Sequence, residues 1–317
     1  MTLPTLDAHV VRRTDLVRIA FTGPQAATVV NGLVTNDVVA LGAGQGCYAV
    51  ALTPKGKIVA DLRIYRTDDA VLTDTTIEAA EGWKALVRKF VNPRLSKYTD
   101  QTPTLGFFEL YGARVGDRLA ALGATWTADY AHGAVTLDGV EAGIARLPGI
   151  GTQPGAVVWC PSESAAAVGE TLQRTGISEG SVDGLEAWRV EGGRPRWGID
   201  MDDTMLAQEA NMDDLHAISY TKGCYTGQEF VARLHYRGHV NRYLRGLRLD
   251  ASVPRGASVV HGDGAIVGDV RSCAVSAQAG PLALALVRRE VPDGATVRVR
   301  TGDAEVGATV IPLPFNR

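Results

Sequence analysis

In the N-terminal third of the chain, short runs of alternating apolar and polar residues predict strands. Two other stretches have helical character. Pro24 suits a first helical turn and Gly32 a helix end, which predicts a helix between them. Apolar residues recur at helical spacing over residues 75–91, which predicts a second, amphipathic helix. The predicted strands are residues 16–21, 47–52, 57–65 and 70–73, with a hairpin turn at residues 53–56.

The middle third predicts a more regular unit. A strand and a helix are followed by a hairpin that turns at Asp138-Gly139, a further strand and a second helix. This order gives most of a ferredoxin-like unit, and another part of the chain would have to complete its sheet. The strands are residues 104–111, 133–137, 140–147 and 155–160, and the helices are residues 113–122 and 164–174.

The last third changes from irregular to strand-rich. A helix is predicted at residues 182–190, a long irregular stretch follows to residue 220, and a turn and a helix lie within residues 222–238. Evenly spaced short strands then predict a small barrel. We divide the chain into residues 1–100, 101–180, 181–242 and 243–317. The barrel strands are residues 244–249, 258–261, 265–270, 282–287, 296–300 and 305–311.

Composition indicates a soluble protein. The chain has 317 residues, 45% of them hydrophobic and 21% charged, and no apolar stretch approaches eighteen residues. The first residues lack the pattern of a signal peptide, so we expect a cytoplasmic protein without membrane contact. The net charge of −3 argues against stable nucleic-acid binding. The four cysteines lie far apart, without the spacing of a metal or redox motif, so no metal site is predicted.

The most informative stretch is residues 222–229, Lys-Gly-Cys-Tyr-Thr-Gly-Gln-Glu. Gly223 and Gly227 lie on either side of Cys224 and permit an exposed turn. Lys222 and the start of the next helix would both favour the thiolate form of this cysteine. The alternative is a tight turn with a buried, inert cysteine. Tyr225, Gln228 and Glu229 complete the motif.

A group of basic residues follows the motif. Arg233 and Arg237 would share one face of the predicted helix and could meet an anion, such as a phosphate or a glutamate tail. The alternative is a solvated basic face at a helix C-terminus. His235 and His239 are four residues apart, but no third metal ligand is evident. Arg242 and Arg245 extend the basic group.

Residues 222–229 resemble the signature of the YgfZ family, described as folate-binding proteins that assist iron–sulfur cluster assembly or repair. The similarity continues through residues 230–233 and 236–238, and weaker pieces lie at residues 32–37, 52–57, 208–211 and 217–219. The family belongs to the glycine-cleavage T-protein (aminomethyltransferase) superfamily. The resemblance therefore implies an α+β fold of three domains in a ring around a central folate pocket, with a C-terminal β-barrel. Cys224 is its implied functional residue.

The resemblance also implies a folate site. Residues 1–100 and 181–242 would form the folate-binding domain, and residues 101–180 the ferredoxin-like domain. Glu191 stands where superfamily members have an acid that binds the pterin ring, and a carboxylate can accept two hydrogen bonds from the pterin edge. Trp188 could stack on the ring or be a core residue. Asp61 stands where aminomethyltransferases have two adjacent acids, but residue 60 here is alanine.

Three hypotheses follow. The first is a protein that binds tetrahydrofolate or a one-carbon derivative and uses Cys224 to support iron–sulfur client proteins, and through them tRNA modification, without being a conventional enzyme. The second is a folate-dependent aminomethyltransferase or demethylase, which Ala60 argues against. The third is a cluster carrier, for which one clear thiolate is too few unless other molecules supply ligands.

Overall fold

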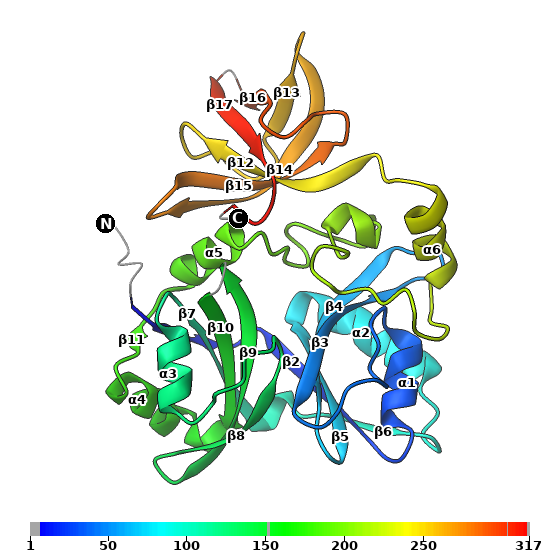
Figure 1. The fold of residues 1–317 in the computed structure, drawn as a ribbon, viewed down its shortest axis with the longest axis vertical. Coiled ribbons are helices and arrows are strands. Elements are labelled where there is room, and N and C mark those ends of the chain that lie inside the picture. Colours follow the sequence, from blue (N-terminus) through cyan, green and yellow to red (C-terminus); the bar gives the residue numbers. More distant parts are fainter. Residues whose placement is uncertain (1–6, 151–152, 303, 316–317) are drawn as a thin grey trace.

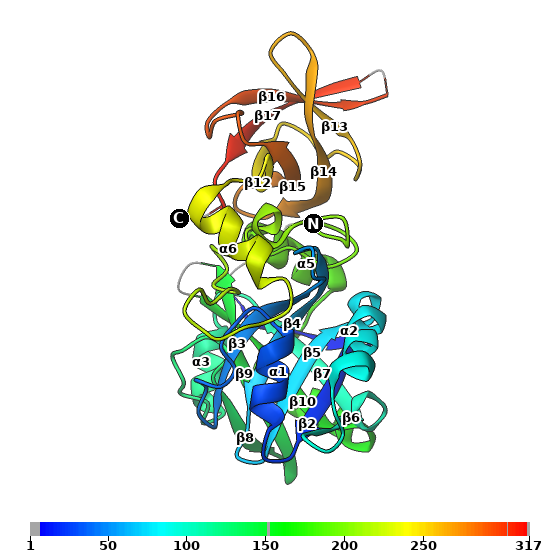
Figure 2. The ribbon, with the colours of Figure 1, turned by 90° about the vertical axis from the view of Figure 1, so that its right-hand side faces the viewer.

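The computed structural model describes residues 7–150, 153–302 and 304–315. Two sheets face one another in one half of the molecule, and a barrel forms the other end, with α5 and irregular segments between them (Figures 1 and 2). The arrangement places three structural units around a common junction.

The first sheet has the strand order β3-β4-β5-β2-β6. Residues 60–64 of strand β4 alternate between two faces: Ala60, Leu62 and Ile64 are buried in the core beneath the helices, whereas Asp61 and Arg63 point to the other face. The helices α1 (Ala26–Leu33) and α2 (Ile77–Phe90) cover the apolar face, with the fully buried Trp83 in α2. The strands are β2 (Leu16–Thr22), β3 (Gln45–Leu52), β4 (Ile58–Arg66), β5 (Ala70–Thr76) and β6 (Lys97–Asp100).

The second sheet has the order β11-β1-β7-β10-β9-β8. The neighbouring strands β1, β7, β10 and β9 are antiparallel and have the order of a ferredoxin-like unit, with β8 added at the edge. The N-terminal strand β1 supplies the missing edge strand, which sequence patterning did not reveal because its five residues include His9, Arg12 and Arg13. The strands are β1 (His9–Arg13), β7 (Leu105–Tyr111), β8 (His132–Leu137), β9 (Val140–Ile150), β10 (Gln153–Pro161) and β11 (Ser178–Glu179).

Helices cover the outer face of this second sheet. Val115 and Leu119 of α3 (Val115–Ala121) and Leu172 of α4 (Ala165–Arg174) share one core with the apolar side chains of β7 and β10. Two short 3₁₀ turns, Thr102–Thr104 and Ser162–Ser164, precede β7 and α4. The ferredoxin-like unit expected from the sequence is therefore present, although β1 comes from the segment assigned to residues 1–100.

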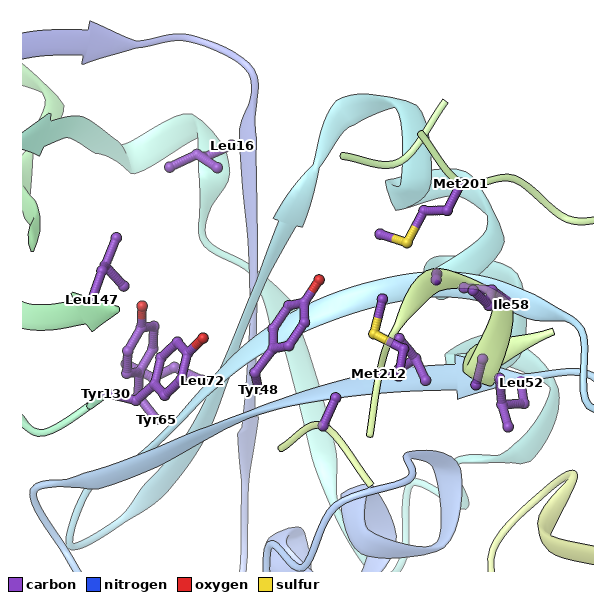
Figure 3. Close-up of a cluster of buried hydrophobic side chains, with 14 of the residues drawn as sticks. Leu16, Tyr48, Leu52, Ile58, Tyr65, Leu72, Tyr130, Leu147, Met201 and Met212 are labelled. Carbon is purple, nitrogen blue, oxygen red and sulfur yellow. The ribbon is translucent and has the colours of Figure 1, made fainter. Parts of the chain in front are cut away.

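The inner faces of the two sheets enclose a shared core. Tyr48 of β3 and Tyr130 before β8 stack with ring centroids 6.3 Å apart, and Leu147 of β9 lies in the same cluster. Figure 3 shows these side chains together with Met201 and Met212 from the irregular segment that follows α5. The long stretch without regular structure is thus part of the core, and it brings residues 200–217 between the sheets and the barrel.

The C-terminal strands form the expected closed barrel, in the order β12-β15-β14-β13-β16-β17. Asn211 donates a 2.6 Å hydrogen bond to the carbonyl of Leu244, and Arg242 pairs with Glu209 at 2.9 Å, so the barrel is tied to the segment before α6. The remaining elements are α5 (Val182–Glu191), a 3₁₀ turn (Ala207–Ala210), α6 (Gln228–Arg237), β12 (Arg242–Leu249), β13 (Ser258–His261), β14 (Ala265–Ser276), β15 (Gly280–Arg288), β16 (Thr296–Thr301) and β17 (Ala304–Ile311).

Candidate functional site

A cavity of about 360 Å³ lies where the inner faces of the two sheets meet α5. Its volume is in the range of small-molecule sites. The wall combines aromatic side chains with an unusual number of charges: six arginines and four acids. The charged residues are Arg12, Arg13, Arg63, Arg189, Arg194, Arg196, Asp15, Asp61, Glu109 and Glu186.

One side of the wall is an ion-pair network across the two sheets. Glu109 of β7 pairs with Arg63 of β4 at 3.1 Å and with Arg13 of β1. Burial alone would raise the pKa of Glu109, but the charges of Arg63 and Arg13 outweigh it and lower the pKa. Glu109 therefore stays ionised. Arg13 also pairs with Asp15 at 2.7 Å, so two arginines and two carboxylates balance in this network, which fixes β1, β4 and β7 relative to one another.

Asp61 lies two residues before Arg63 on the same face of β4. Tyr48 donates a 2.9 Å hydrogen bond to its Oδ2 atom. Its Oδ1 atom is buried and has no hydrogen-bond partner among the described residues. Burial raises the pKa of Asp61, opposed by the hydrogen bond from Tyr48 and the charge of Arg63. Because a buried acceptor is normally hydrogen-bonded, the free Oδ1 atom of Asp61 could accept a hydrogen bond from a ligand.

Helix α5 supplies the third part of the wall through Glu186, Trp188 and Arg189. The buried indole Nε1–H of Trp188 lacks a partner among the described residues. Glu191, at the end of the same helix, is buried and does not belong to the described wall of the cavity. Its backbone carbonyl accepts a hydrogen bond from Phe315. Asp61 and Trp188 thus line the same cavity, and Glu191 is not among its lining residues.

Arg189 connects the cavity to the barrel. Its guanidinium donates to Glu186 at 2.9 Å, to the fully buried Asp200 at 2.7 Å and to Ser272 of β14 at 2.8 Å. Ser272 in turn donates to Asp200 at 2.6 Å. Since both carboxylates and the hydroxyl are satisfied by one guanidinium, α5 is held in a fixed position between the cavity and the barrel.

The motif of residues 222–229 lies on the end of α1. The Lys222 ammonium donates to the carbonyls of Asn31, Val34 and Asn36 at 2.6, 2.8 and 2.7 Å. Burial lowers the pKa of Lys222 to about 8, opposed by the charge of Asp37. The ammonium therefore caps α1 and fixes the loop. The three hydrogen bonds of the ammonium are to these carbonyls and not to Cys224.

Cys224 itself is exposed, so of the two alternatives left by the sequence the buried cysteine is excluded, whereas Cys160 is buried. The neighbouring Tyr225 is buried, which anchors the loop beside the exposed thiol. Gly227 has φ of 85° and lies where a Cβ would approach the carbonyl oxygen of Thr53 at 2.7 Å, so glycine is required there. Gly223 has open space around it and shows no such constraint.

The cysteine is not in the described cavity wall. The same segment reaches the cavity at Leu215 and then runs outward to the motif. Along it, Ser219 donates from its backbone to Thr35, and Asn36 donates to the carbonyls of Tyr48 and His216. The cavity and the exposed thiol are therefore joined by one continuous, hydrogen-bonded stretch rather than by a shared pocket.

The basic residues after the motif differ in the partners that they contact. Arg242 and Arg245 pair with Glu209 and Asp293. Arg233 lies over the ring of Phe230 at 4.7 Å, and neither it nor Arg237 has an ion pair among the described residues. His235 stacks on Tyr220 with centroids 3.7 Å apart. Within residues 7–150, 153–302 and 304–315, no group of three His, Cys, Asp or Glu side chains could hold a metal ion.

Sequence reasoning missed Arg13, Arg63 and Glu109 as wall residues. A signal was available for two of them. Arg63 follows Asp61 at the strand period of two, and Glu109 is the one acid in the apolar strand β7. Arg13 could not be found, because its strand was not predicted.

We expect Lys222→Met to lower the free energy of unfolding by about 2–4 kcal/mol, because three carbonyls lose a charged donor. Lys55→Met is the matched control, since Lys55 is exposed; it should change stability by about 0.5 kcal/mol at most. Urea unfolding measures both. Equal midpoints for the two variants would show that the ammonium does not hold the loop.

Taken together, the fold and the cavity define the class: an α+β protein of two facing sheets and a closed barrel, with an enclosed, charge-lined cavity at their junction. Residues 7–219 match the GCVT N-terminal domain family, and residues 242–316 match the glycine cleavage T-protein C-terminal barrel domain. The chain belongs to the glycine cleavage T-protein family.

Relatives of two kinds are similar to the chain. An aminomethyltransferase of Ralstonia pickettii is 28% identical, with 98% of this chain and 87% of the relative covered. A tRNA-modifying protein YgfZ of Edwardsiella ictaluri is 29% identical, with 98% and 93% covered. The crystal structure of glycine cleavage system aminomethyltransferase T from Bartonella henselae matches with a TM-score of 0.85 at 20% identity, covering 98% of this chain and 86% of that one. That likeness shows the fold.

The overall identities to the two kinds of relative are nearly equal, so they leave the choice between them to the residues of the site. In the described part of the chain, no helix has the length and apolarity needed to cross a membrane.

Proposed function

We propose that this protein binds tetrahydrofolate or a one-carbon derivative in the cavity and uses Cys224 to support iron–sulfur cluster assembly or repair in client proteins, and through them tRNA modification. The observation that carries the proposal is the exposed thiol of Cys224 on a loop that Lys222 fixes to α1. The resemblance of residues 222–229 to the YgfZ signature supports it.

The cavity residues fit a folate. A pterin is flat and carries both N–H donors and acceptors, and the cavity offers aromatic side chains, the free acceptor Oδ1 of Asp61 and the unpartnered N–H groups of Trp188, Arg194 and Arg196. The excess of arginines suits the carboxylates of the glutamate tail. When bound, tetrahydrofolate supplies one-carbon chemistry. Asp61 and Trp188 would contact the pterin ring directly. Glu191, which does not line the cavity, would affect binding indirectly, from the end of α5.

One observation favours the second candidate, a folate-dependent aminomethyltransferase. From the sequence, Ala60 indicates the loss of one acid of a pair. In the structure Ala60 is fully buried on the helix-covered face of β4, and Asp61 faces the cavity. The acid that could reach a ligand is therefore retained, and Ala60 carries less weight against transfer activity than the sequence indicated.

Titration with tetrahydrofolate should quench tryptophan fluorescence, because Trp188 and Trp197 line the cavity. Trp188→Phe should remove a large part of the quench. Trp126→Phe is the control, since Trp126 packs in the ferredoxin-like unit. Glu191→Gln should weaken binding, and unchanged affinity would remove Glu191 from the site. A titration without quenching, confirmed by calorimetry, would refute folate binding altogether.

A further inference from the structure

The surface around α6 differs in charge from the chain as a whole. The protein has a net charge of −3, yet residues 220–245 contain five lysines and arginines and a single acid, Glu229. Three of these cations are used internally: Lys222 by carbonyls, Arg242 by Glu209 and Arg245 by Asp293. The two cations left, Arg233 and Arg237, lie one turn apart on α6 and point their charge to solvent.

The β3–β4 turn adds a third cation to this surface. A Cβ on Gly56 of that turn would come within 2.8 Å of Phe230 Cβ, so the turn touches α6. Lys55, next to Gly56, is exposed. The ring of Phe230 also contacts Arg233, whose guanidinium carbon lies 4.7 Å from the ring centroid. Lys55 and Arg233 thus lie on either side of the Gly56–Phe230 contact, and Arg237 is exposed one turn further along α6; we call this surface the α6 face.

Aromatic side chains lie beside these cations. Of the ten described residues of α6, Val231 alone is buried, so the helix is attached by one side and otherwise open. Tyr236 is 67% exposed, and its ring contacts the stacked pair of Tyr220 and His235 edge-on. Exposed aromatic and arginine side chains together are the composition of protein–protein interfaces.

Cys224 is close to the α6 face in the chain. It precedes the helix by four residues, and Gly227 at the start of α6 rests on Thr53 of the same β3–β4 turn. Figure 2 shows α6 on the outside of the molecule, next to the end of α1 where the motif loop is fixed. A molecule that approaches the thiol therefore meets the basic and aromatic surface.

We propose that the α6 face is the docking surface for a client protein that presents an acidic patch to Cys224. The inference rests on the proposed function of Cys224 and adds how a client is recognised. A protein partner fits better than a nucleic acid, because three free cations on a chain of net charge −3 are few for a polyanion but enough to steer a compact acidic surface. At about 0.01 M salt these charges act over about 30 Å, and at about 1 M salt over only about 3 Å.

Thiol exchange at Cys224 measures this steering directly. Two short peptides carry one cysteine each as a 2-thiopyridyl disulfide; one has four glutamates and the other four lysines. The Cys224 thiolate forms a disulfide with the peptide sulfur, the bond to the thiopyridyl sulfur breaks, and the leaving group takes up a proton and absorbs light. The background from the other cysteines is subtracted with Cys224→Ser.

At low ionic strength the acidic peptide should react about 10-fold faster than the basic one, and the ratio should approach one at high salt. Arg233→Glu with Arg237→Glu should reverse the preference. The control is Lys89→Glu with Arg94→Glu, which changes the net charge by the same amount in and after α2 and should keep the preference for the acidic peptide. The control is matched because Lys89 lies over a phenylalanine ring, Phe90, at 5.1 Å, as Arg233 lies over Phe230. Polyglutamate should compete better than polyuridylate.

Equal rates for the two peptides, or an unchanged preference in the α6 variant, would overturn the inference. Stronger competition by polyuridylate would overturn the choice of a protein partner. These outcomes are separate from the proposed function. If Cys224→Ser still supported iron–sulfur enzymes in cells, the function would be refuted while the rate difference remained. If that variant failed in cells but the two peptides reacted equally, only the docking surface would be refuted.

Discussion

Cells that lack the protein and carry Cys224→Ser should have no more iron–sulfur enzyme activity than cells with an empty vector, although the variant folds. Cys224 is exposed, so the exchange of sulfur for oxygen should change the free energy of unfolding by about 0.5 kcal/mol at most. Serine keeps the size and hydrogen bonding of the side chain but not a thiolate. The loss of activity should therefore come from the missing thiolate and not from unfolding. It is measured as aconitase activity at matched levels of the protein.

Two controls make this result specific. Cys273→Ser changes a half-buried thiol in the barrel and should restore activity. At neutral pH, alkylation followed by mass spectrometry should modify Cys224 first, because Cys160 is buried and burial raises the pKa of Cys47 to about 12. Full activity of the Cys224→Ser strain would contradict the central role of the motif and favour the transferase candidate.

Much of the fold could be predicted because most elements carry a local signal. The barrel strands are separated by turn residues, and residues 60–64 of β4 alternate between buried and partly exposed side chains. The strand β1 could not be predicted, since His9 and Arg13 give it little apolar character and its place depends on pairing with β7, almost a hundred residues later. Non-local pairing of this kind leaves no mark in a local pattern.

The candidate site was only half visible in the sequence. Cys224 stood out because an unusual composition surrounds it, and Asp61 because one acid lies in an apolar strand. The direction of the Lys222 side chain was not predictable: whether its ammonium faces Cys224 or the end of α1 depends on where residues nearly two hundred positions earlier fold. Glu191 shows the converse, since motif position alone suggested a residue that contacts the ligand, whereas Glu191 is buried and is not among the residues that line the cavity.

The connection between the cavity and the motif loop is also visible only in three dimensions. Residues 215–222 run from the cavity to the motif, and both ends are tied to the segment after α1 through Asn36 and Lys222. A ligand that shifts Tyr48 or Leu215 would act on the same hydrogen-bonded segment that holds Cys224. This gives a physical reason for one chain to combine a ligand cavity with a surface thiol.

Asp61→Asn should weaken tetrahydrofolate binding about 10- to 100-fold, because the pterin N–H groups would lose a carboxylate acceptor worth about 1.5–3 kcal/mol. Asparagine keeps the shape and the acceptor for Tyr48, so stability should change little. Isothermal calorimetry measures the affinity. Asp68→Asn, an exposed acid outside this cavity, is the control and should bind as the wild type does.

The pH dependence of binding separates this role from a structural one. Burial raises the pKa of Asp61, so its carboxylate is lost at a higher pH than an ordinary aspartate as the solution is acidified. Only the ionised form accepts hydrogen bonds with both oxygens. Wild-type affinity should therefore fall as pH decreases through that raised pKa, and the affinity of Asp61→Asn should lack this step. Identical pH profiles for the two proteins would show that Asp61 does not bind the ligand.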